Sequence, residues 1–337
     1  MAVSVFLCQS CSREKSSINE GIHDLSAATC AVVYTTDTGD HTHIEWLDKN
    51  MKAVDSTNYS FSGASLDGFA NAAMYDNRII LAPRGDNQTR DYGNIAVIHT
   101  SDGKLDEIAI NHVNPTGCSV EGPTVAVISN LNMVNYIDLA NINTGEVKTV
   151  ELDATEPTLM DVILIDDHIY GYAMVDNSDG CCICSVDISS GKCKVIAELP
   201  DASTFMAKYG KELLFISDGQ LVRYDTSSEK IRRQTLTRKD AFNLQVIGNT
   251  AWVAYTDIHD AEYDSLMEAI DLESGNVICS TRHKGAIMQL EGNDNTIFVL
   301  GFDKLYQYIL TDGSLHLQNS VKCEKDGYCI GGFYYFG

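Results

Sequence analysis

The sequence contains no apolar run of the about 18 residues that a membrane-spanning helix needs. It also contains no Gly-x-Ser-x-Gly, His-Glu-x-x-His, Walker A or dinucleotide-binding pattern, so the enzymes that those motifs mark have no support here. No amphipathic helix of useful length is evident. Basic residues are scarce, since 24 Lys and Arg stand against 47 Asp and Glu for a net charge of -23. So acidic a surface repels phosphate backbones and argues against a nucleic-acid partner.

The N-terminal stretch "MAVSVFLCQSCSREKSS" has an apolar start followed by Ser10, Cys11 and polar residues. It resembles the end of a bacterial lipoprotein signal in which Cys11 is the lipidated residue. It differs in lacking a basic segment and in having a short apolar part. We therefore expect residues 1–28 to be an N-terminal tether that holds the protein outside the cytoplasm through a lipid at Cys11. The alternative is a disordered N-terminus of a cytoplasmic protein.

Eleven cysteines in 337 residues are far fewer than a disulfide-built scaffold has. Cys323 and Cys329 are spaced to close a short loop, and Cys184 and Cys193 flank one hairpin. The run 181–184 holds three cysteines but lacks a second cysteine pair or a His pair at zinc spacing. We interpret these cysteines as packed thiols or disulfides.

One short pattern recurs along the chain: a strand, a polar turn that usually contains Gly, and a second strand. Gly supplies the positive φ of such a turn, and Asp, Asn, Ser and Thr hydrogen-bond to the local backbone. Seven segments show it: "TTDTGDHTHIEWL" (35–47), "HTSDGKLDEIAI" (99–110), "NINTGEVKTVEL" (141–152), "DISSGKCKVIAEL" (187–199), "DTSSEKIRRQTL" (225–236), "DLESGNVICSTR" (271–282) and "LTDGSLHLQNS" (310–320). From Gly103 to Gly313 the five intervals average 42 residues, with Glu229 in place of Gly in one turn. A period of about 40–50 residues built from short strands is typical of a β-propeller.

Two further strands precede most of these turns, as in "MDVILIDDHIYGYAMVD" (160–176). Each unit is therefore expected to have four strands, a to d, and stacked units bury faces that a single unit cannot. The last residues, 327–337, are expected to supply strands a and b, and residues 30–47 strands c and d, of one composite blade. The fold class predicted is all-β: residues 29–337 form a seven-bladed β-propeller of four-stranded antiparallel blades. An insertion at roughly 49–66 is expected to join the first two blades.

The turn segments "VDISSGK", "IDLESGN" and "ANINTGE" resemble the repeats of the PQQ-like and YVTN-type bacterial propellers, whose blades carry an Asp-x-x-Ser/Thr-Gly-Lys/Glu turn. The resemblance implies the propeller fold over most of the chain. The Trp that usually follows the turn in PQQ-type repeats is absent, except for Trp46, so we infer no quinone.

In a propeller the a–b and c–d turns lie on one face, and the b–c and d–a connections on the other. The b–c connections are longer and more varied here, so we expect the ligand on that face. One of them, 256–265, contains five side chains suited to a hard cation such as calcium: Asp257, His259, Asp260, Glu262 and Asp264. Another, 83–93, contains Arg84, Arg90 and Tyr92, which are suited to an anionic or sugar ligand. Its Arg-Gly-Asp tripeptide, 84–86, is compatible with adhesion.

The nine histidines are spread along the chain. His41 and His43 lie two residues apart on the strand expected to be outermost in the composite blade, so we predict that they are exposed. His112 and His283 fall near d–a connections, on the same face as His259.

We infer a non-enzymatic propeller that binds a protein, a small molecule or a glycan through the face formed by b–c and d–a connections. It is expected to be a monomer, without a cofactor unless it holds calcium. The alternative is a metal-assisted lyase or hydrolase at the mouth of the central channel, using His259, His112 or His283.

Overall fold

The computed structural model describes residues 23–36, 41–61, 73–83, 93–113, 115–131, 134–153, 156–175, 180–199, 205–257, 260 and 262–337. Regular structure in these ranges consists of 27 β-strands. Within them there is no helix of the length and hydropathy that crossing a membrane requires.

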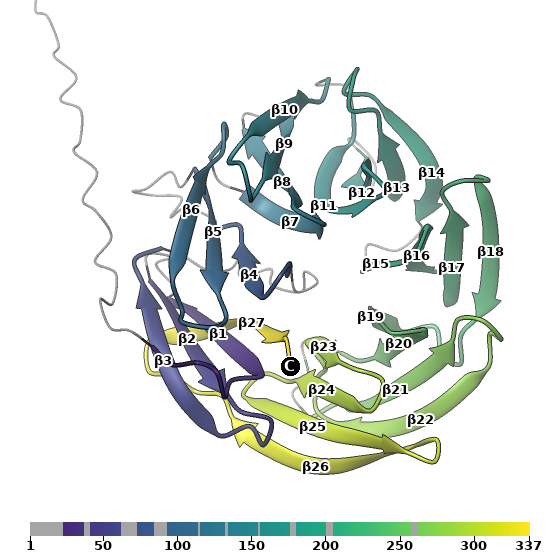
Figure 1. Ribbon diagram of the computed structural model, residues 1–337. Helices are drawn as coiled ribbons and strands as arrows, with labels where there is room; N and C mark the ends of the chain where they lie inside the picture. The colour runs from purple at the N-terminus through teal and green to yellow at the C-terminus, as the bar shows by residue number, and fades with distance from the viewer. Residues whose placement is uncertain are drawn as a thin grey trace, which may run out of the picture.

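The strands form seven antiparallel sheets arranged in a ring (Figure 1). Blade I contains β4 (Arg78–Leu81), β5 (Asn94–His99) and β6 (Leu105–Ala109); blade II contains β7 (Pro115–Glu121), β8 (Thr124–Leu131), β9 (Val134–Asn141) and β10 (Val147–Glu151); blade III contains β11 (Thr158–Ile165), β12 (His168–Met174), β13 (Cys181–Val186) and β14 (Cys193–Leu199); blade IV contains β15 (Met206–Tyr209), β16 (Glu212–Ser217), β17 (Gln220–Asp225) and β18 (Lys230–Thr235). Blade V contains β19 (Ala241–Ile247), β20 (Thr250–Tyr255), β21 (Asp264–Asp271) and β22 (Val277–Lys284); blade VI contains β23 (Gln289–Gly292), β24 (Thr296–Leu300), β25 (Lys304–Thr311) and β26 (Ser314–Lys322); blade VII contains β27 (Tyr328–Tyr335), β1 (Cys30–Thr36), β2 (Thr42–Leu47) and β3 (Ala53–Tyr59).

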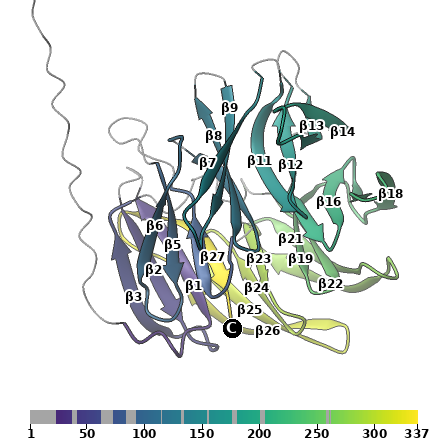
Figure 2. The ribbon, with the colours of Figure 1, turned by 45° about the horizontal axis from the view of Figure 1, so that its top comes forward.

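In Figure 1 the first labelled strand of each blade lies toward the centre of the ring and the last lies at the rim, and Figure 2 shows the same blades turned by 45°. Blade I has three named strands, and its inner strand is represented by the bridge between Met74 and Ile79 and by a hydrogen bond from the Ile80 amide to the Ala73 carbonyl. The predicted fold class, a seven-bladed β-propeller closed by a composite blade, is therefore confirmed.

The composite blade differs from the prediction in how the two ends of the chain share it. The C-terminal segment supplies one strand, β27, and the N-terminal segment supplies three, β1 to β3. The expectation of two strands from each end was wrong, and so was the expectation that 49–66 is an insertion, because β3 lies within it. Segment 35–47 is accordingly the b and c strands of blade VII. The closure is made by β1 and β27, whose register runs from Cys30 opposite Tyr335 to Thr36 opposite Tyr328.

The predicted c–d turns of blades I to VI contain the positive φ angles that their sequences require. The predicted turn position has a φ of 68° at Gly103, 66° at Gly191 and 56° at Glu229. At Gly191 a Cβ would lie 2.0 Å from the carbonyl oxygen of Glu151 in blade II, so close approach as well as backbone conformation requires Gly there.

The true c–d turn of blade VII has the same side-chain chemistry but no glycine. The carboxylate of Asp48 accepts hydrogen bonds from the amides of Asn50 and Lys52 at 2.8 and 2.9 Å, and Met51 takes a φ of 60°. Asp187 likewise accepts bonds from the amides of Ser189 and Ser190, two and three residues on, at 2.8 and 3.0 Å. A search for glycine therefore passes over this turn.

The hydrophobic core is divided into seven clusters, one between each pair of neighbouring blades. Strand β16 is buried along its whole length, whereas β18 at the rim is almost entirely exposed. A closed ring gives every blade two buried faces and leaves only rim strands as edges, which protects the sheets from pairing with other chains.

Candidate functional site

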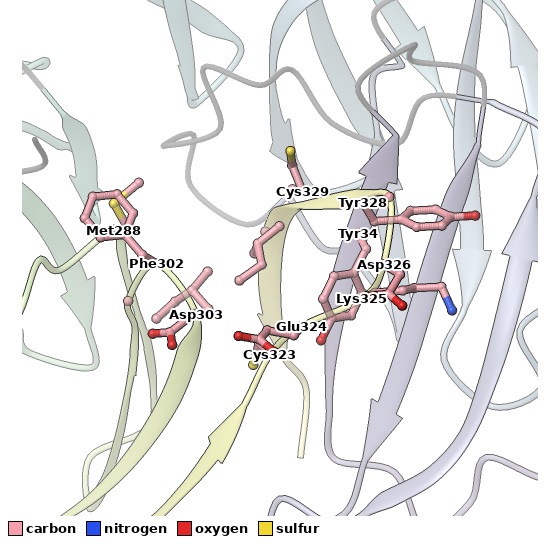
Figure 3. Close-up of a pocket in the computed structure, with 16 residues that line it drawn as sticks. Tyr34, Met288, Phe302, Asp303, Cys323, Glu324, Lys325, Asp326, Tyr328 and Cys329 are labelled. Atoms are coloured by element: carbon pink, nitrogen blue, oxygen red, sulfur yellow. The ribbon is translucent and has the colours of Figure 1, made fainter. Parts of the chain in front are cut away.

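A cavity of about 560 Å³ opens on the face of the b–c and d–a connections, between blade VI and blade VII (Figure 3). It is bounded by the b–c turn that joins β24 to β25, by the d–a connection that joins β26 to β27, and by the start of β27. Its lining comprises Tyr34, Met288, 300–303, 323–329 and 330–332. This volume lies within the about 300–1,000 Å³ typical of small-molecule sites.

Backbone hydrogen bonds order the two walls of this cavity. The amide of Cys323 donates to the carbonyl of Asp303 at 2.7 Å, so the d–a connection is tied to the b–c turn. The amide of Tyr328 donates to the carbonyl of Lys325 at 3.0 Å, which closes a turn before β27 begins. The cavity walls therefore belong to the ordered hydrogen-bonding pattern of the two blades.

The lining is acidic and partly aromatic. Three carboxylates, those of Asp303, Glu324 and Asp326, and one ammonium group, that of Lys325, line the cavity, and Glu324 is also paired with Lys322 at 2.5 Å. The Lys325 Nζ lies 5.3 Å from the centroid of the Tyr328 ring, a favourable cation–π distance. In Figure 3 the carboxylates of Asp303 and Glu324 point toward the same space between the two walls. A group with positive charge and an apolar body is the chemical complement of this lining.

Beneath the cavity lies a buried aromatic cluster. Tyr34 is 1% exposed and donates its hydroxyl to the Glu45 carboxylate at 3.1 Å. Its pKa lies far above the ordinary value because the hydroxyl is buried. The His43 ring lies 5.8 Å from that of Tyr34 and 6.2 Å from that of Tyr328, and its Nδ1 contacts the Asn58 side-chain oxygen at 2.8 Å.

The prediction that His41 and His43 are exposed is wrong for His43, which is 8% exposed. Strand β2 is the third strand of blade VII, not the outermost, because β3 covers it. Burial lowers the pKa of His43. His41 precedes β2 and is exposed.

The acidic connection of blade V contains ion pairs. Glu262 pairs with Lys284 and Asp264 pairs with Arg282, each at 2.6 Å. The Asp260 carboxylate accepts the amide of Glu262 at 2.9 Å. Asp257 lies in the same connection, and His259 lies outside the described residues. No group of three or more His, Cys, Asp or Glu suited to a metal is found in the described part of the chain.

Of the other predicted binding residues, the structure describes His112 and His283. Arg84, Arg90 and Tyr92 lie outside the described ranges, as does Cys11. The Nδ1 of His112 lies 3.2 Å from the carboxylate of Asp138, and its ring stacks on Tyr136 at a centroid distance of 3.9 Å. Asp138 is 1% exposed and also accepts the amides of residues 111 and 112, so it holds this d–a connection in place.

His283 lies on β22 and is 3% exposed, in a different blade from His112. Its Nδ1 contacts the Tyr308 hydroxyl at 2.9 Å, and burial lowers its pKa to about 4. At neutral pH this imidazole is uncharged and enclosed between blades V and VI.

The nine cysteines in the described ranges are free thiols. Cys323 and Cys329 do not form the short loop that their spacing allows, and Cys184 and Cys193 are likewise unbridged. Burial raises the pKa of Cys323 to about 11, so at neutral pH it is a thiol rather than a thiolate.

The cavity residues were not found by sequence analysis, although the predicted face includes them. The available signal was the charged run "CEKDGYC" (323–329) between the last two strands. The b–c turn at Gly301–Asp303 gave no signal, because three residues without a motif look like any tight turn.

No family model matches the sequence, and no curated protein matches it. Apo AztD from Citrobacter koseri has a similar fold, with a TM-score of 0.55 and 11% identity over 91% of this chain and 97% of that chain. A chain of the mitotic checkpoint complex has a TM-score of 0.54 and 12% identity, over 78% of this chain and 82% of that chain. The dihydro-heme d1 dehydrogenase NirN in complex with DHE has a TM-score of 0.53 and 14% identity, over 95% of this chain and 78% of that chain. At these identities the likeness shows the fold alone, and the chain is a seven-bladed β-propeller.

Proposed function

We propose that the protein is a non-enzymatic binding propeller that takes a protein partner on the face formed by the b–c and d–a connections. The observation that carries this proposal is the acidic, aromatic cavity between blades VI and VII. A similar fold occurs in the mitotic checkpoint complex, which is an assembly of proteins. A rigid ring with variable connections on one face suits this role.

The partner inferred is one that inserts a Lys or Arg side chain into the cavity. The aliphatic part of such a side chain packs on Tyr328 and Met288, and its charged end meets the carboxylates of Asp303, Glu324 and Asp326. The net charge of -23 adds a long-range attraction for a basic partner and raises the association rate at low salt.

A peptide library displayed on phage and selected against the intact protein tests this proposal. The expected result is enrichment of Lys or Arg beside an apolar residue. One selected peptide is then measured by calorimetry against a triple variant, Asp303→Asn, Glu324→Gln and Asp326→Asn. We expect roughly tenfold weaker binding, since three partly exposed ion pairs contribute about 0.5 kcal/mol each.

A matched control removes the same charge from the opposite face. Asp102→Asn, Glu146→Gln and Glu273→Gln lie at c–d turns and are exposed. This second triple variant is expected to bind the peptide within twofold of the wild type. Peptides without basic residues, or equal weakening in both triple variants, would contradict the proposal.

Two finer points of identity and location remain proposals. The PQQ-like or YVTN-type repeat assignment is supported by the Asp-x-x-Ser/Thr-Gly turns at Gly191 and Gly275. Attachment outside the cytoplasm through Cys11 is supported by the N-terminal pattern alone. Metabolic labelling with a radioactive fatty acid tests it: label on the wild type that is lost in Cys11→Ser supports the anchor, and an unlabelled wild type contradicts it.

A further inference from the structure

A second cavity, of about 280 Å³, lies in the central channel, away from the cavity between blades VI and VII. The inner strands of five blades line it, and each contributes one or more residues: Ala73 and Met74, 118–120 of β7, 161–163 of β11, Ala207 and Lys208 of β15, and Gln245 and Val246 of β19. Most of these side chains are apolar or small. This volume is close to the lower end of the about 300–1,000 Å³ of typical ligand sites, so any occupant is small.

Asp161 is a carboxylate in this cavity that has no charged partner among the described residues. One oxygen, Oδ1, accepts the amide of Val162 at 2.8 Å. The same oxygen lies close to Gly117 on the neighbouring strand β7. A Cβ atom added at Gly117 would be 3.4 Å from this oxygen. The second oxygen has no hydrogen-bond donor in the described ranges. Asp161 is half-buried, and a carboxylate partly removed from water without a counter-ion is unfavourable, which makes its retention in this cavity informative.

The ionisable groups on the strands around β11 do not neutralise it. Lys208 on β15 is engaged by the carboxylate of Glu121 on β7 and by the carbonyl of Val120 at 3.1 Å. Cys118 on β7 and Tyr172 on β12, the register partner of Asp161, are acids and carry no positive charge. The ammonium that lines the cavity is therefore already paired with another carboxylate.

Burial raises the pKa of Asp161 to about 7, with the Val162 hydrogen bond acting in the opposite direction. Burial, together with the charge of Asp161, raises the pKa of Cys118 to about 12. Both raised pKa values are expected where a carboxylate is shielded from water and has no positively charged group nearby.

We propose that the channel cavity is a binding site for a small organic ammonium ion, whose charge pairs with Asp161 and whose apolar part packs on Met74, Val162 and Val246. A bare metal ion suits the site less well, because hard cations take six to eight oxygen ligands and the described residues offer no cluster of three. The site is separate from the one in the proposed function, and neither depends on the other.

The test uses the intact protein with benzylammonium as the probe and benzyl alcohol as its neutral analogue. Calorimetry is expected to show a Kd of about 1 mM or tighter for benzylammonium and at least tenfold weaker binding for benzyl alcohol. Since the ammonium binds the ionised carboxylate, affinity is expected to fall about tenfold from pH 8 to pH 6. In buffers of different ionisation enthalpy, about half a proton is expected to be released per ligand bound at pH 7.

Asp161→Asn removes the charge at nearly constant shape and is expected to weaken benzylammonium binding at least tenfold. Asp102→Asn, at an exposed c–d turn outside both cavities, is the control and is expected to leave both affinity and proton release unchanged. The wild-type pH dependence and proton release decide the matter even if Asp161→Asn folds poorly. The proposal is overturned if the wild type shows no binding at about 10 mM probe, if no proton is released, or if Asp161→Asn binds as tightly as the wild type.

Discussion

Truncation of one aromatic side chain at the closure of the ring is expected to destabilise the whole propeller. Phe333 lies on β27, is 1% exposed, and packs against Phe298 of blade VI with ring centroids 5.2 Å apart. Its backbone is also held by Gln289, whose side chain accepts the Phe333 amide at 2.9 Å and donates to the Phe333 carbonyl at 2.8 Å. Phe333→Ala keeps these backbone bonds and removes only the packing of the ring.

The magnitude follows from the burial of the ring. Truncating a fully buried Phe costs about 3–5 kcal/mol, of which the lost ring pair accounts for about 0.5–1.5 kcal/mol. Urea unfolding followed by circular dichroism measures this difference. With a slope of about 3 kcal/mol per molar urea, the midpoint is expected to fall by about 1 M or more.

Phe302→Ala is the matched control, because Phe302 is 43% exposed at the edge of the loop-face cavity. Its free energy of unfolding is expected to stay within about 0.5 kcal/mol of the wild type. If Phe333→Ala behaves like Phe302→Ala, β27 does not contribute to a closed ring, and the cavity between blades VI and VII loses one wall.

Three further measurements test separate parts of the structure. Gly191→Ala is expected to lower the melting temperature more than Gly145→Ala. Both residues have positive φ, which costs an Ala about 1–3 kcal/mol, but only at Gly191 would the added Cβ also meet a backbone oxygen. Equal shifts in melting temperature would contradict the close approach at Gly191. The buried His283 binds a proton more weakly in the folded state, where its pKa is about 4, than in the unfolded state. Stability is therefore expected to fall as pH decreases from about 6.5 to 4, by about 3 kcal/mol in total, and His283→Gln should flatten this slope; an unchanged slope would contradict the burial. Cys329 is exposed and Cys323 is 3% exposed, so Cys329→Ser is expected to remove one thiol that reacts rapidly with Ellman's reagent at pH 8, whereas Cys323→Ser should remove none; the reverse pattern would contradict the placement of the two thiols.

The two cavities separate two kinds of recognition within one scaffold. The loop-face cavity lies where the first and last parts of the chain meet, so its lining comes from residues almost 300 positions apart, such as Tyr34 and Tyr328. The channel cavity is lined by successive inner strands, so its residues recur at roughly the spacing of the blades. Ligands at the two places can therefore be altered independently by substitution.

The repeat was readable from local chemistry. Turn glycines such as Gly103 and Gly191 need positive φ, and aspartates such as Asp187 bond to the next amides, so each c–d turn identifies itself within a few residues. Repetition of that signal at about 42 residues was sufficient to predict seven blades and a closed ring.

The division of blade VII was decided only by tertiary structure. Rim strands such as β3, with the mostly polar sequence AVDSTNY, lack a hydrophobic alternation. Its preceding turn uses Met51 at positive φ instead of glycine, so the local signal was weak there as well. Burial of His43 followed from the same unseen strand.

The sequence by itself determined the number of blades, the four-strand repeat and the face that carries the varied connections, because those properties follow from turns and short-range periodicity. The positions of Asp303, Asp161 and Lys208 relative to other blades were decided by ring closure. A cavity is made by residues that are distant in sequence and become neighbours only when sheets stack. No local pattern records which side chains will meet there, or which carboxylate will be left without a counter-ion.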